Sequence, residues 1–581
     1  MRTGASPFGR RNETMSPPPS SHPSAATGLG GASPLHWRSA LRRPVVADAL
    51  VGLAALAVLG VAMASIHALT SGLSGSDEGA HFLNGYLVWS YLTEAFGRNP
   101  LAFATEFYVH YPKISIGHWP PLYYVFLSVF FFVLPQRVGS LMGVNLVVGA
   151  WPAWLISRLV RPLFGWRWAL LAALAYVLLP ISLGNTSRLM LDQAVAGLCL
   201  WGALRWSAYA RAPSLWRGLA YAALAATAVL VKGNGWVLAV FPLFHIALTR
   251  RWRLLADWRT WVSGAAALAA VGAWTLVTYK ISSDGFNYAW GPGFFLRAMP
   301  YYLSALVDNL GWWGVLAALA GAAVALRRGA SPELREIGHT GLALVLATLL
   351  FQSIVPVDLD PRYLSPALPH LVVFMVIGTQ AAWQRLPMRQ PARWRPALRV
   401  ARLLLPGLLL VPGLLYLHGR PVRYDLRMDQ VARELASRPG GQVVVVDGHA
   451  GTEGALASEV ALRDRARQRY VVRSSQLLAK SDFMGARYAL KVATPAAVLP
   501  LLDEIGCNAV VVAEGVNILP RLAHSDQLRQ ALELPNSPFR LAQTHAHIGE
   551  AGRTLLFLRK EPVAPRPDAV RRVNFPEKAP R

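Results

Sequence analysis

Cysteine is almost absent from this sequence, and charged residues are scarce. Only two of the 581 residues are cysteines, Cys199 and Cys507, and they lie in different regions. Two separated cysteines exclude a disulfide framework, so we expect both to be small, buried apolar side chains. Charged residues make up 15% of the chain, whereas roughly a quarter is usual in soluble proteins. This shortage of charge argues against a soluble protein.

Acidic residues are in particularly short supply. The chain has 31 Asp and Glu against 57 Lys and Arg, a formal net charge of +26. Such a balance is typical of nucleic-acid-binding proteins, but here the arginines are clustered between apolar segments, as at Arg42 and Arg43 and at Arg250 and Arg251. That placement indicates orientation by positive loops and contact with anionic head groups. We therefore expect membrane lipids, and no nucleic acid, as partners.

Several common signatures are also missing from the sequence. We find no internal repeat, P-loop, Gly-rich dinucleotide fingerprint or metal-spaced Cys/His cluster. The N-terminus is rich in Ser, Pro and Gly, which predicts a disordered cytoplasmic segment over residues 1–40. It is not a cleavable signal peptide, because the first apolar segment starts too late, is too long and is followed by no convincing A-x-A site.

Long apolar runs dominate what is present. Hydrophobic residues make up 54% of the chain, and its mean hydropathy is +0.34. Many runs approach the ~20 residues that cross a bilayer core. The first, at about 45–70, has a basic N-terminal flank, which places the following loop on the outer face. Further runs lie at roughly 121–135, 141–160, 168–183, 192–210, 217–231, 234–249, 260–278, 312–326, 340–357, 366–383 and 401–417. The sequence predicts a polytopic α-helical membrane domain over 41–419, with about 11–13 spans.

The composition changes after Leu417, where charge density becomes normal. Short β-rich runs (Gln442–Asp447, Arg469–Arg473, Ala509–Ala513, Thr554–Leu558) alternate with helical patterns (Met428–Ser437, Glu453–Asp464, Thr494–Ile505). This alternation predicts a small extracytoplasmic α/β domain with a partly parallel sheet over 420–562. Residues 563–581, rich in Pro and Arg, are expected to be disordered.

The first external loop, 71–120, concentrates residues that suit chemistry at a membrane surface. Asp77 and Glu78 lie where a helix has just left the bilayer. A carboxylate there is able to deprotonate a hydroxyl that attacks a sugar C1, help worth about 10²–10⁴-fold. The alternative is that Asp77 only caps the next helix. That helix, apolar at helical spacing over 82–92, is expected to lie in the interface.

The loop closes with His118-Trp-Pro-Pro-Leu-Tyr-Tyr, at the start of the next apolar run. Two prolines fix the angle at which a helix begins, and Tyr123 and Tyr124 suit the membrane interface. On these residues alone, the motif is equally a well-anchored helix start with His118 on the surface.

Ionisable residues also occur inside or beside apolar sequence. Arg188 and Asp192 are four residues apart and would share a face of one helix, either as a structural ion pair or facing a cavity. Lys232 lies at a span boundary, where it either snorkels to the interface or binds phosphate. Arg362, followed by Tyr363, stands beside prolines at a span entrance and is placed to hold a phosphate bidentately; alternatively Asp358 or Asp360 pairs with it.

Taken in order, these elements resemble the GT-C class of membrane glycosyltransferases, which includes protein O-mannosyltransferases and bacterial aminoarabinose transferases. The resemblance covers roughly residues 45–420. It rests on Asp77-Glu78 after the first span and on Arg188…Asp192. It also rests on His118-Trp-Pro-Pro-Leu-Tyr-Tyr, similar to the family's His-Pro-Pro-Leu-Tyr-Tyr with one residue inserted, and on Asp360-Pro-Arg-Tyr-Leu-Ser-Pro-Ala-Leu-Pro, similar to its Arg-Tyr-Leu…Pro-Ala.

The resemblance implies inverting transfer of a sugar from a polyprenyl-phosphate donor to an acceptor hydroxyl on a lipid, a glycan or a protein. It implies an active site on the extracytoplasmic face of a cell membrane, with the bacterial inner membrane expected. Asp77 would be the base and Glu78 its support. The substrate-binding candidates are His118, Arg188, Asp192, Lys232, Arg362 and Tyr363. Because the first loop lacks an Asp-x-Asp, we expect no metal or other cofactor, although oligosaccharyltransferases of this class use a divalent ion.

Two other functions would also use a chain with many apolar runs. A transporter or flippase of lipid-linked sugars predicts midplane charges, broken helices and repeated halves, but the chain shows no repeat and its acidic pair lies at a membrane edge. The second function is a membrane anchor for a C-terminal binding module. It does not explain why the chain has about a dozen apolar runs.

Overall fold

The computed structural model describes residues 34–115, 117–283, 285–386, 395–420, 422–480, 488–515 and 522–575. The first 33 residues of the segment expected to be disordered lie outside this description. Two compact units are present, Met1–Val46 and Ala47–Arg581. All contacts discussed below lie within the second unit.

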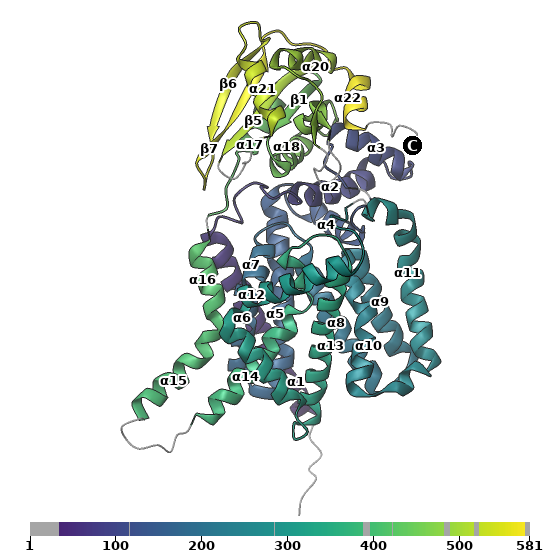
Figure 1. Ribbon diagram of the computed structural model, residues 1–581, viewed down its shortest axis with the longest axis vertical. Coiled ribbons are helices and arrows are strands. Elements are labelled where there is room, and N and C mark those ends of the chain that lie inside the picture. Colours follow the sequence, from purple (N-terminus) through teal and green to yellow (C-terminus); the bar gives the residue numbers. More distant parts are fainter. Residues whose placement is uncertain are drawn as a thin grey trace, which may run out of the picture. The chain divides into compact units, whose positions relative to one another are not determined.

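The described residues between 34 and 419 are almost entirely helical (Figure 1). Each apolar run expected from the sequence overlaps one helix or two consecutive helices. The helices are α1 (Pro34–Ser65), α2 (Glu78–Glu94), α3 (Pro100–His110), α4 (Leu122–Val133), α5 (Val138–Phe164), α6 (Trp166–Leu178), α7 (Pro180–Thr186), α8 (Asp192–Arg211), α9 (Leu215–Val231), α10 (Val237–Thr249), α11 (Trp258–Ser283), α12 (Pro292–Leu326), α13 (Pro332–Ile354), α14 (Leu368–Arg385), α15 (Arg395–Gly407) and α16 (Val411–Gly419), with short 3-10 turns η1 (Gly233–Trp236), η2 (Trp252–Leu255), η3 (Pro361–Leu364) and η5 (Leu408–Leu410).

Fewer helices are long enough to cross a membrane than the 11–13 that we expected. Within the described residues, six are long and apolar enough, or seven if α6 and α7, bent by 63°, form one span. Several apolar runs form short helices instead. The 12 residues of α4 rise about 18 Å at 1.5 Å per residue, short of the ~30 Å hydrocarbon core.

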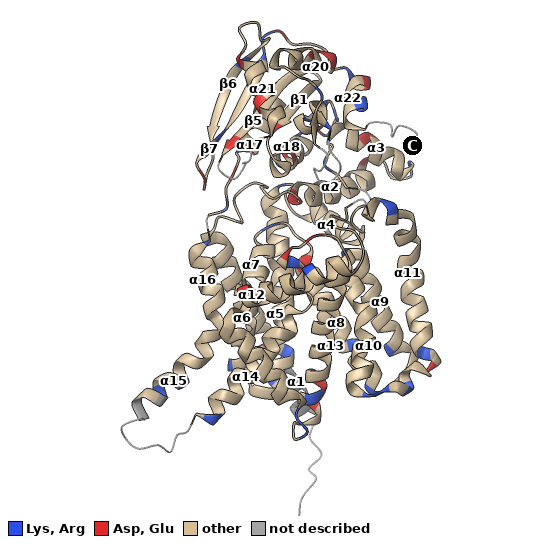
Figure 2. Ribbon diagram, viewed as in Figure 1, with Lys and Arg blue, Asp and Glu red and all other residues tan. Residues whose placement is uncertain are grey.

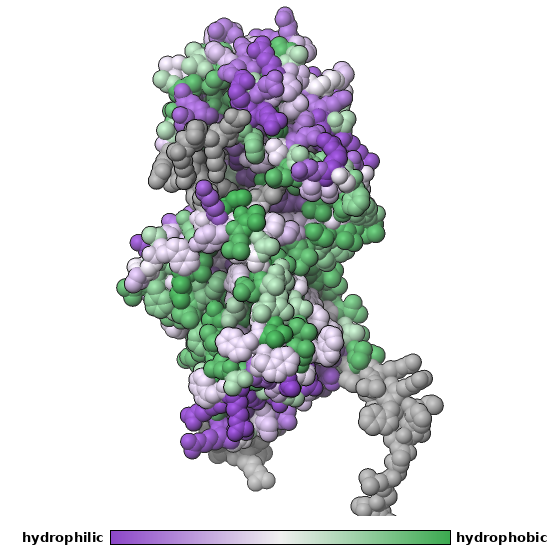
Figure 3. All heavy atoms as spheres, turned by 90° about the vertical axis from the view of Figure 1, so that its right-hand side faces the viewer, coloured by the Kyte–Doolittle hydropathy of each residue, from purple (hydrophilic) through white to green (hydrophobic). Residues whose placement is uncertain are grey.

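The surface of the long helices is apolar and suits lipid. On α11, Leu276 is 81% and Val277 is 80% exposed, a placement that would be unfavourable in water. The face seen in Figure 3 is hydrophobic over the helices and hydrophilic over the sheet domain. Along most of the long helices, Lys, Arg, Asp and Glu are concentrated near the ends (Figure 2). The chain is a multi-pass membrane protein.

Helix α2 is the element that carries the acidic pair, and it is packed on several sides. It contacts α4 and also α18 (Ala450–Arg463) of the C-terminal domain. The contact is close because Gly79 meets Gly454: a Cβ on Gly79 would lie 2.5 Å from the Gly454 Cα. The helix expected over 82–92 is thus confirmed, and its first three turns are almost fully buried.

The C-terminal domain is built on a five-stranded mixed sheet in the order β2-β1-β5-β7-β6. Strands β1, β2 and β5 are parallel, whereas β7 runs antiparallel to β5 and β6. The strands are β1 (Gln442–Asp447), β2 (Arg469–Arg473), β5 (Cys507–Gly515), β6 (Phe539–Ala546) and β7 (Gly552–Arg559), with a separate pair β3 (Ala479–Lys480) and β4 (Ala489–Leu490). The partly parallel sheet expected from the sequence is confirmed.

Helices flank this sheet. They are α17 (Met428–Ser437), α18, α19 (Ser474–Leu477), η6 (Pro495–Ala497), α20 (Val498–Glu504), α21 (Ala523–Glu533) and α22 (Pro567–Asn574). Three of them, α19, α21 and α22, were not predicted from the sequence. Disorder was expected over 563–581, yet α22 is ordered within that range. Asn574 donates hydrogen bonds to the carbonyls of Val109 and Val471, both at 2.8 Å, which tie the helix down. Cys199 and Cys507 are both buried and unpaired, as expected.

Candidate active site

Asp77 and Arg362 form the centre of the candidate site. Asp77 stands at the N-terminus of α2, but its side chain makes no capping hydrogen bond. Instead its Oδ2 accepts a hydrogen bond from Arg362 Nη1 at 2.9 Å. Arg362 lies on η3, where Asp360 caps the turn and holds the guanidinium, with Oδ2 3.1 Å from Nε. The side chains of Asp77 and Arg362 remain 25% and 21% exposed, so a ligand is able to reach both.

The local charges keep the Asp77 carboxylate ionised. Burial alone would raise its pKa, but Arg362, together with His81 and Lys232, outweighs burial and lowers the pKa of Asp77 to about 2. One helical turn later, burial lowers the pKa of His81 to about 4, although Asp77 opposes this shift. His81 is therefore neutral at pH 7 and shares a hydrogen bond with the Tyr124 hydroxyl, at 2.9 Å from Nδ1.

A second ion pair adjoins the first. Asp192, the first residue of α8, has its Oδ1 2.7 Å from the Nζ of Lys232, which follows α9. The Tyr363 ring joins the two pairs, because the Lys232 Nζ and the Arg362 Cζ both lie 5.4 Å from its centroid. Asp192 is 1% exposed, and its Oδ2 has no hydrogen-bond partner among the described residues. One carboxylate oxygen is thus left for another donor.

Glu78 lies next to Asp77 but is fully enclosed. Its carboxylate is 0% exposed and accepts hydrogen bonds from the backbone N–H groups of Ser74, Gly75 and Leu189. The Arg423 Nη2 lies 2.8 and 2.9 Å from its two oxygens. Although burial alone would raise it, Arg423 and these N–H groups lower the pKa of Glu78. Glu78 therefore ties together three segments of the chain.

The two remaining candidates are Arg188 and His118, and neither lies in the cluster formed by the two ion pairs. Arg188 is exposed in the turn between α7 and α8, so it shares no helix face with Asp192, which pairs with Lys232 instead. The segment cannot be one helix because α7 ends at Thr186. His118 is half-buried and packs edge-on against Trp119, with ring centroids 4.9 Å apart. A hydrogen bond from Ser282 Oγ to the Gly117 carbonyl, 3.2 Å, brings the C-terminal end of α11 to this motif.

Sequence reasoning missed His81 and Arg423. His81 carried a usable signal, because it is four residues after Asp77 and the two positions adjoin on a helix. Arg423 carried none, since a single arginine beyond the last apolar run resembles many others. Within the described ranges, no group of three or more His, Cys, Asp or Glu side chains is placed to hold a metal ion.

Comparisons with known proteins show which fold this is. No protein-family model matches the chain, and no curated protein matches it. Among solved structures, ArnT from Cupriavidus metallidurans in the apo state aligns with a TM-score of 0.53 and 15% identity, over 89% of this chain and 98% of ArnT. ArnT bound to undecaprenyl phosphate aligns with a TM-score of 0.52 and 15% identity, over 87% and 97% of the two chains. This chain therefore has the fold of the GT-C membrane glycosyltransferases.

Proposed function

We propose that this chain is an integral-membrane glycosyltransferase. It moves a sugar from a polyprenyl-phosphate donor to an acceptor hydroxyl at the extracytoplasmic surface. The observation that supports this best is the cluster of two carboxylates and two cations, Asp77, Arg362, Asp192 and Lys232, drawn from four separate segments. ArnT, which has the same fold, was crystallised with undecaprenyl phosphate, a compound of the class proposed here as the carrier.

In the proposed reaction the acceptor oxygen attacks the sugar C1 from the face opposite the phosphate. Asp77 takes the hydroxyl proton as the new C–O bond forms. The bond between C1 and the phosphate oxygen breaks, and the polyprenyl phosphate leaves with the electron pair, so the configuration at C1 inverts. Arg362 and Lys232 stabilise the charge that develops on the departing phosphate. We propose transfer without a divalent ion, because the first loop lacks an Asp-x-Asp.

The Asp77–Arg362 contact provides a link between donor binding and base strength. With its pKa at about 2, Asp77 is a weak base while Arg362 is paired to it. A donor phosphate that engages Arg362 competes for the same guanidinium. Since Arg362 is the main group that lowers the pKa of Asp77, its diversion to phosphate raises that pKa toward the working pH, where a base is more effective. The donor thus activates the base.

The remaining candidates hold substrate or position the base. Asp192 fixes Lys232 and keeps one free oxygen for a sugar or acceptor hydroxyl. Glu78 has no oxygen left exposed, so we assign it a positioning role: it anchors the residue that precedes it, Asp77, to the rest of the fold. His118 and Arg188 remain predicted substrate contacts.

The test of this function is sugar transfer by the purified full-length chain in lipid nanodiscs. A panel of radiolabelled polyprenyl-phosphate sugars would be offered with water, lipid, glycan and peptide acceptors. We expect one donor to be consumed with release of polyprenyl phosphate. Movement of a lipid-linked sugar across vesicle bilayers without any turnover would contradict the proposal and support a flippase.

We expect Arg362→Gln to weaken binding of the carrier. The variant loses a charge-assisted hydrogen bond to phosphate, worth about 1.5–3 kcal/mol, or roughly 10–100-fold in Kd. Calorimetric titration of nanodiscs with polyprenyl phosphate measures this directly. The control is Arg98→Gln, which removes an exposed arginine that pairs with Glu106. Equal affinity in wild type and Arg362→Gln would remove Arg362 from the donor site.

The same variant should change the pH dependence of residual activity. Removal of the guanidinium leaves only His81 and Lys232 to oppose burial, so the pKa of Asp77 rises from about 2. A raised pKa means that the base is protonated at higher pH, so activity is lost earlier on acidification. We expect kcat/KM, which reports the free enzyme, to be unaffected by Asp77 titration in wild type between pH 4 and 7 and to fall within that range in Arg362→Gln. Parallel profiles would contradict the assignment of Asp77 as the base.

A further inference from the structure

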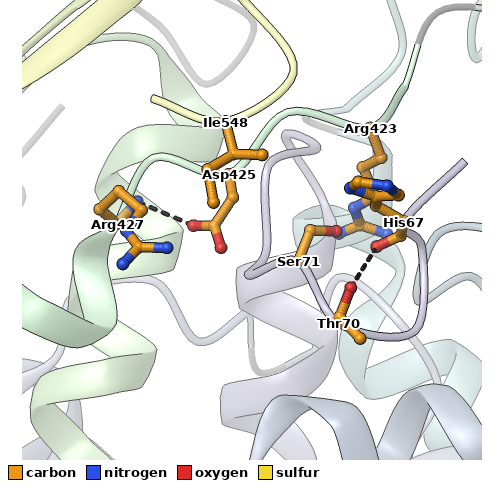
Figure 4. A pocket seen from close by; sticks show the side chains of 7 residues that line it. All are labelled: His67, Thr70, Ser71, Arg423, Asp425, Arg427 and Ile548. Carbon is orange, nitrogen blue, oxygen red and sulfur yellow. Dashed lines mark hydrogen bonds between the residues drawn. The ribbon is translucent and has the colours of Figure 1, made fainter. Parts of the chain in front are cut away.

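A small pocket lies where the loop after α1 meets the segment leading into α17 (Figure 4). Its volume is about 210 Å³, and it shares no residue with the Asp77–Arg362–Asp192–Lys232 cluster. His67, Thr70 and Ser71 line it from the loop, Arg423, Asp425 and Arg427 from the segment before α17, and Ile548 from the turn between β6 and β7. The reaction proposed above does not use it.

Two buried donors in this pocket have no partner among the described residues: the Ser71 Oγ and the Arg423 Nε. Ser71 is 6% and Arg423 is 8% exposed. Buried polar groups are almost always hydrogen-bonded, and leaving one unpaired costs free energy. Both groups therefore call for a ligand that accepts hydrogen bonds inside the pocket.

The charges of the pocket favour a neutral ligand over an anion. The Arg423 guanidinium is already neutralised by Glu78, at 2.8 and 2.9 Å. The Asp425 carboxylate lines the same space as the Arg427 guanidinium, so their charges offset each other. An added phosphate would meet the negative charge of Asp425 without an uncompensated cation. The Asp425 Oδ1 already accepts a hydrogen bond from the Arg427 backbone N–H at 2.8 Å. Among the described residues, this leaves the Asp425 Oδ2 as an acceptor beside the donors of Ser71 and Arg423.

Hydroxyl groups match such a mixture, because each one donates and accepts. Ile548 adds an apolar surface on which the C–H face of a sugar ring can rest. At about 30 Å³ per water, the pocket corresponds to about seven waters, which is space for one pyranose ring and little more. The backbone of the lining residues also supports a ligand site. His67 and Arg427 both have left-handed backbone conformations, with φ of 59° and 60°. Such conformations concentrate at ligand sites.

We propose that this pocket binds a single neutral sugar residue, the end of a glycan held outside the transfer site. Asp425 accepts from ring hydroxyls, while Ser71 and Arg423 donate to them. Binding in this pocket does not depend on catalysis of transfer, so the two proposals fail separately.

Saturation-transfer NMR on the full-length chain in nanodiscs tests this, with methyl glycosides of hexoses, N-acetylhexosamines and pentoses as probes. We expect saturable binding of at least one glycoside. Asp425→Asn should weaken it about tenfold or more, since a charged hydrogen-bond acceptor is lost, and Ser71→Ala should weaken it severalfold. The variants Asp429→Asn, at an exposed pair on α17, and Asp77→Asn should leave this binding unchanged.

Three results would overturn the assignment. The first is the lack of saturable binding by every glycoside. The second is binding that neither Asp425→Asn nor Ser71→Ala changes, when both variants retain the wild-type melting temperature. The third is a result in which no glycoside binds, inorganic phosphate binds saturably, and Ser71→Ala weakens the phosphate binding. That result would make the pocket an anion site.

Discussion

Asp77→Asn is expected to lower the turnover of the polyprenyl-phosphate sugar by about 10²–10⁴-fold, the usual worth of a general base. The asparagine carbonyl oxygen still accepts the hydrogen bond from Arg362, now 2.9 Å from Asp77 Oδ2, so geometry is largely retained. It cannot take a proton from the acceptor. Single-turnover assays with radiolabelled donor in nanodiscs measure the loss, and the melting temperature reports whether the fold is intact.

The matched control is Asp360→Asn. Asp360 is the other carboxylate on Arg362, and its Oδ1 caps the η3 turn, a contact that asparagine preserves. If loss of activity came only from disturbing Arg362, both variants would lose activity alike. We expect less than tenfold loss for Asp360→Asn. Comparable losses in the two would refute the role of Asp77 as base.

Glu78→Gln is expected to be the most destabilising single substitution in the site, by about 3–5 kcal/mol, the usual cost of breaking a buried ion pair. It leaves Arg423 buried without its counter-ion. In glutamine, the amide nitrogen also replaces an oxygen that accepts from backbone N–H groups. Because the pKa of Glu78 is lowered from 4.5, the wild-type contribution is present above that value and is lost as pH falls through the lowered pKa.

Glu94→Gln, on the same helix, is the control for this effect. Glu94 pairs with Arg467 at 3.0 Å, but its side chain is 27% exposed, and such pairs contribute roughly 0–1 kcal/mol. Thermal unfolding of both variants in the same detergent gives the comparison. A loss in Glu78→Gln no larger than that in Glu94→Gln would show that the Glu78–Arg423 pair does not hold the site in place.

These two variants separate neighbouring carboxylates that look alike in the sequence. Asp77 remains partly exposed and faces a cation that a phosphate is able to take over. Glu78 is enclosed and bound on both oxygens. The expected outcomes therefore differ in kind: Asp77→Asn changes turnover with little effect on stability, and Glu78→Gln changes stability first and activity through it.

The sequence by itself determined the class of protein and much of its local structure. The small share of charged residues and the long apolar runs are properties of the composition and of neighbouring residues. They therefore indicate a membrane protein without any knowledge of how the helices pack. Strands Gln442–Asp447 and Arg469–Arg473 and helix Met428–Ser437 have the bounds expected from their patterns, because periodicity is a property of neighbouring residues. Strand β6 (Phe539–Ala546) was not predicted, because its polar residues do not give the pattern of a β-rich run.

Only the tertiary structure decided which charges meet. Arg362 lies 285 residues from Asp77, and Arg423 lies 345 residues from Glu78. Within a helix, spacing relates residues a few positions apart, and it predicted that Arg188 would share a face with Asp192. However, helix α7 ends at Thr186, before Arg188. Asp192 begins the next helix and pairs with Lys232. Pairs of this kind depend on how whole helices pack, and packing arises from the apolar surface of the entire fold, which no local stretch of sequence contains.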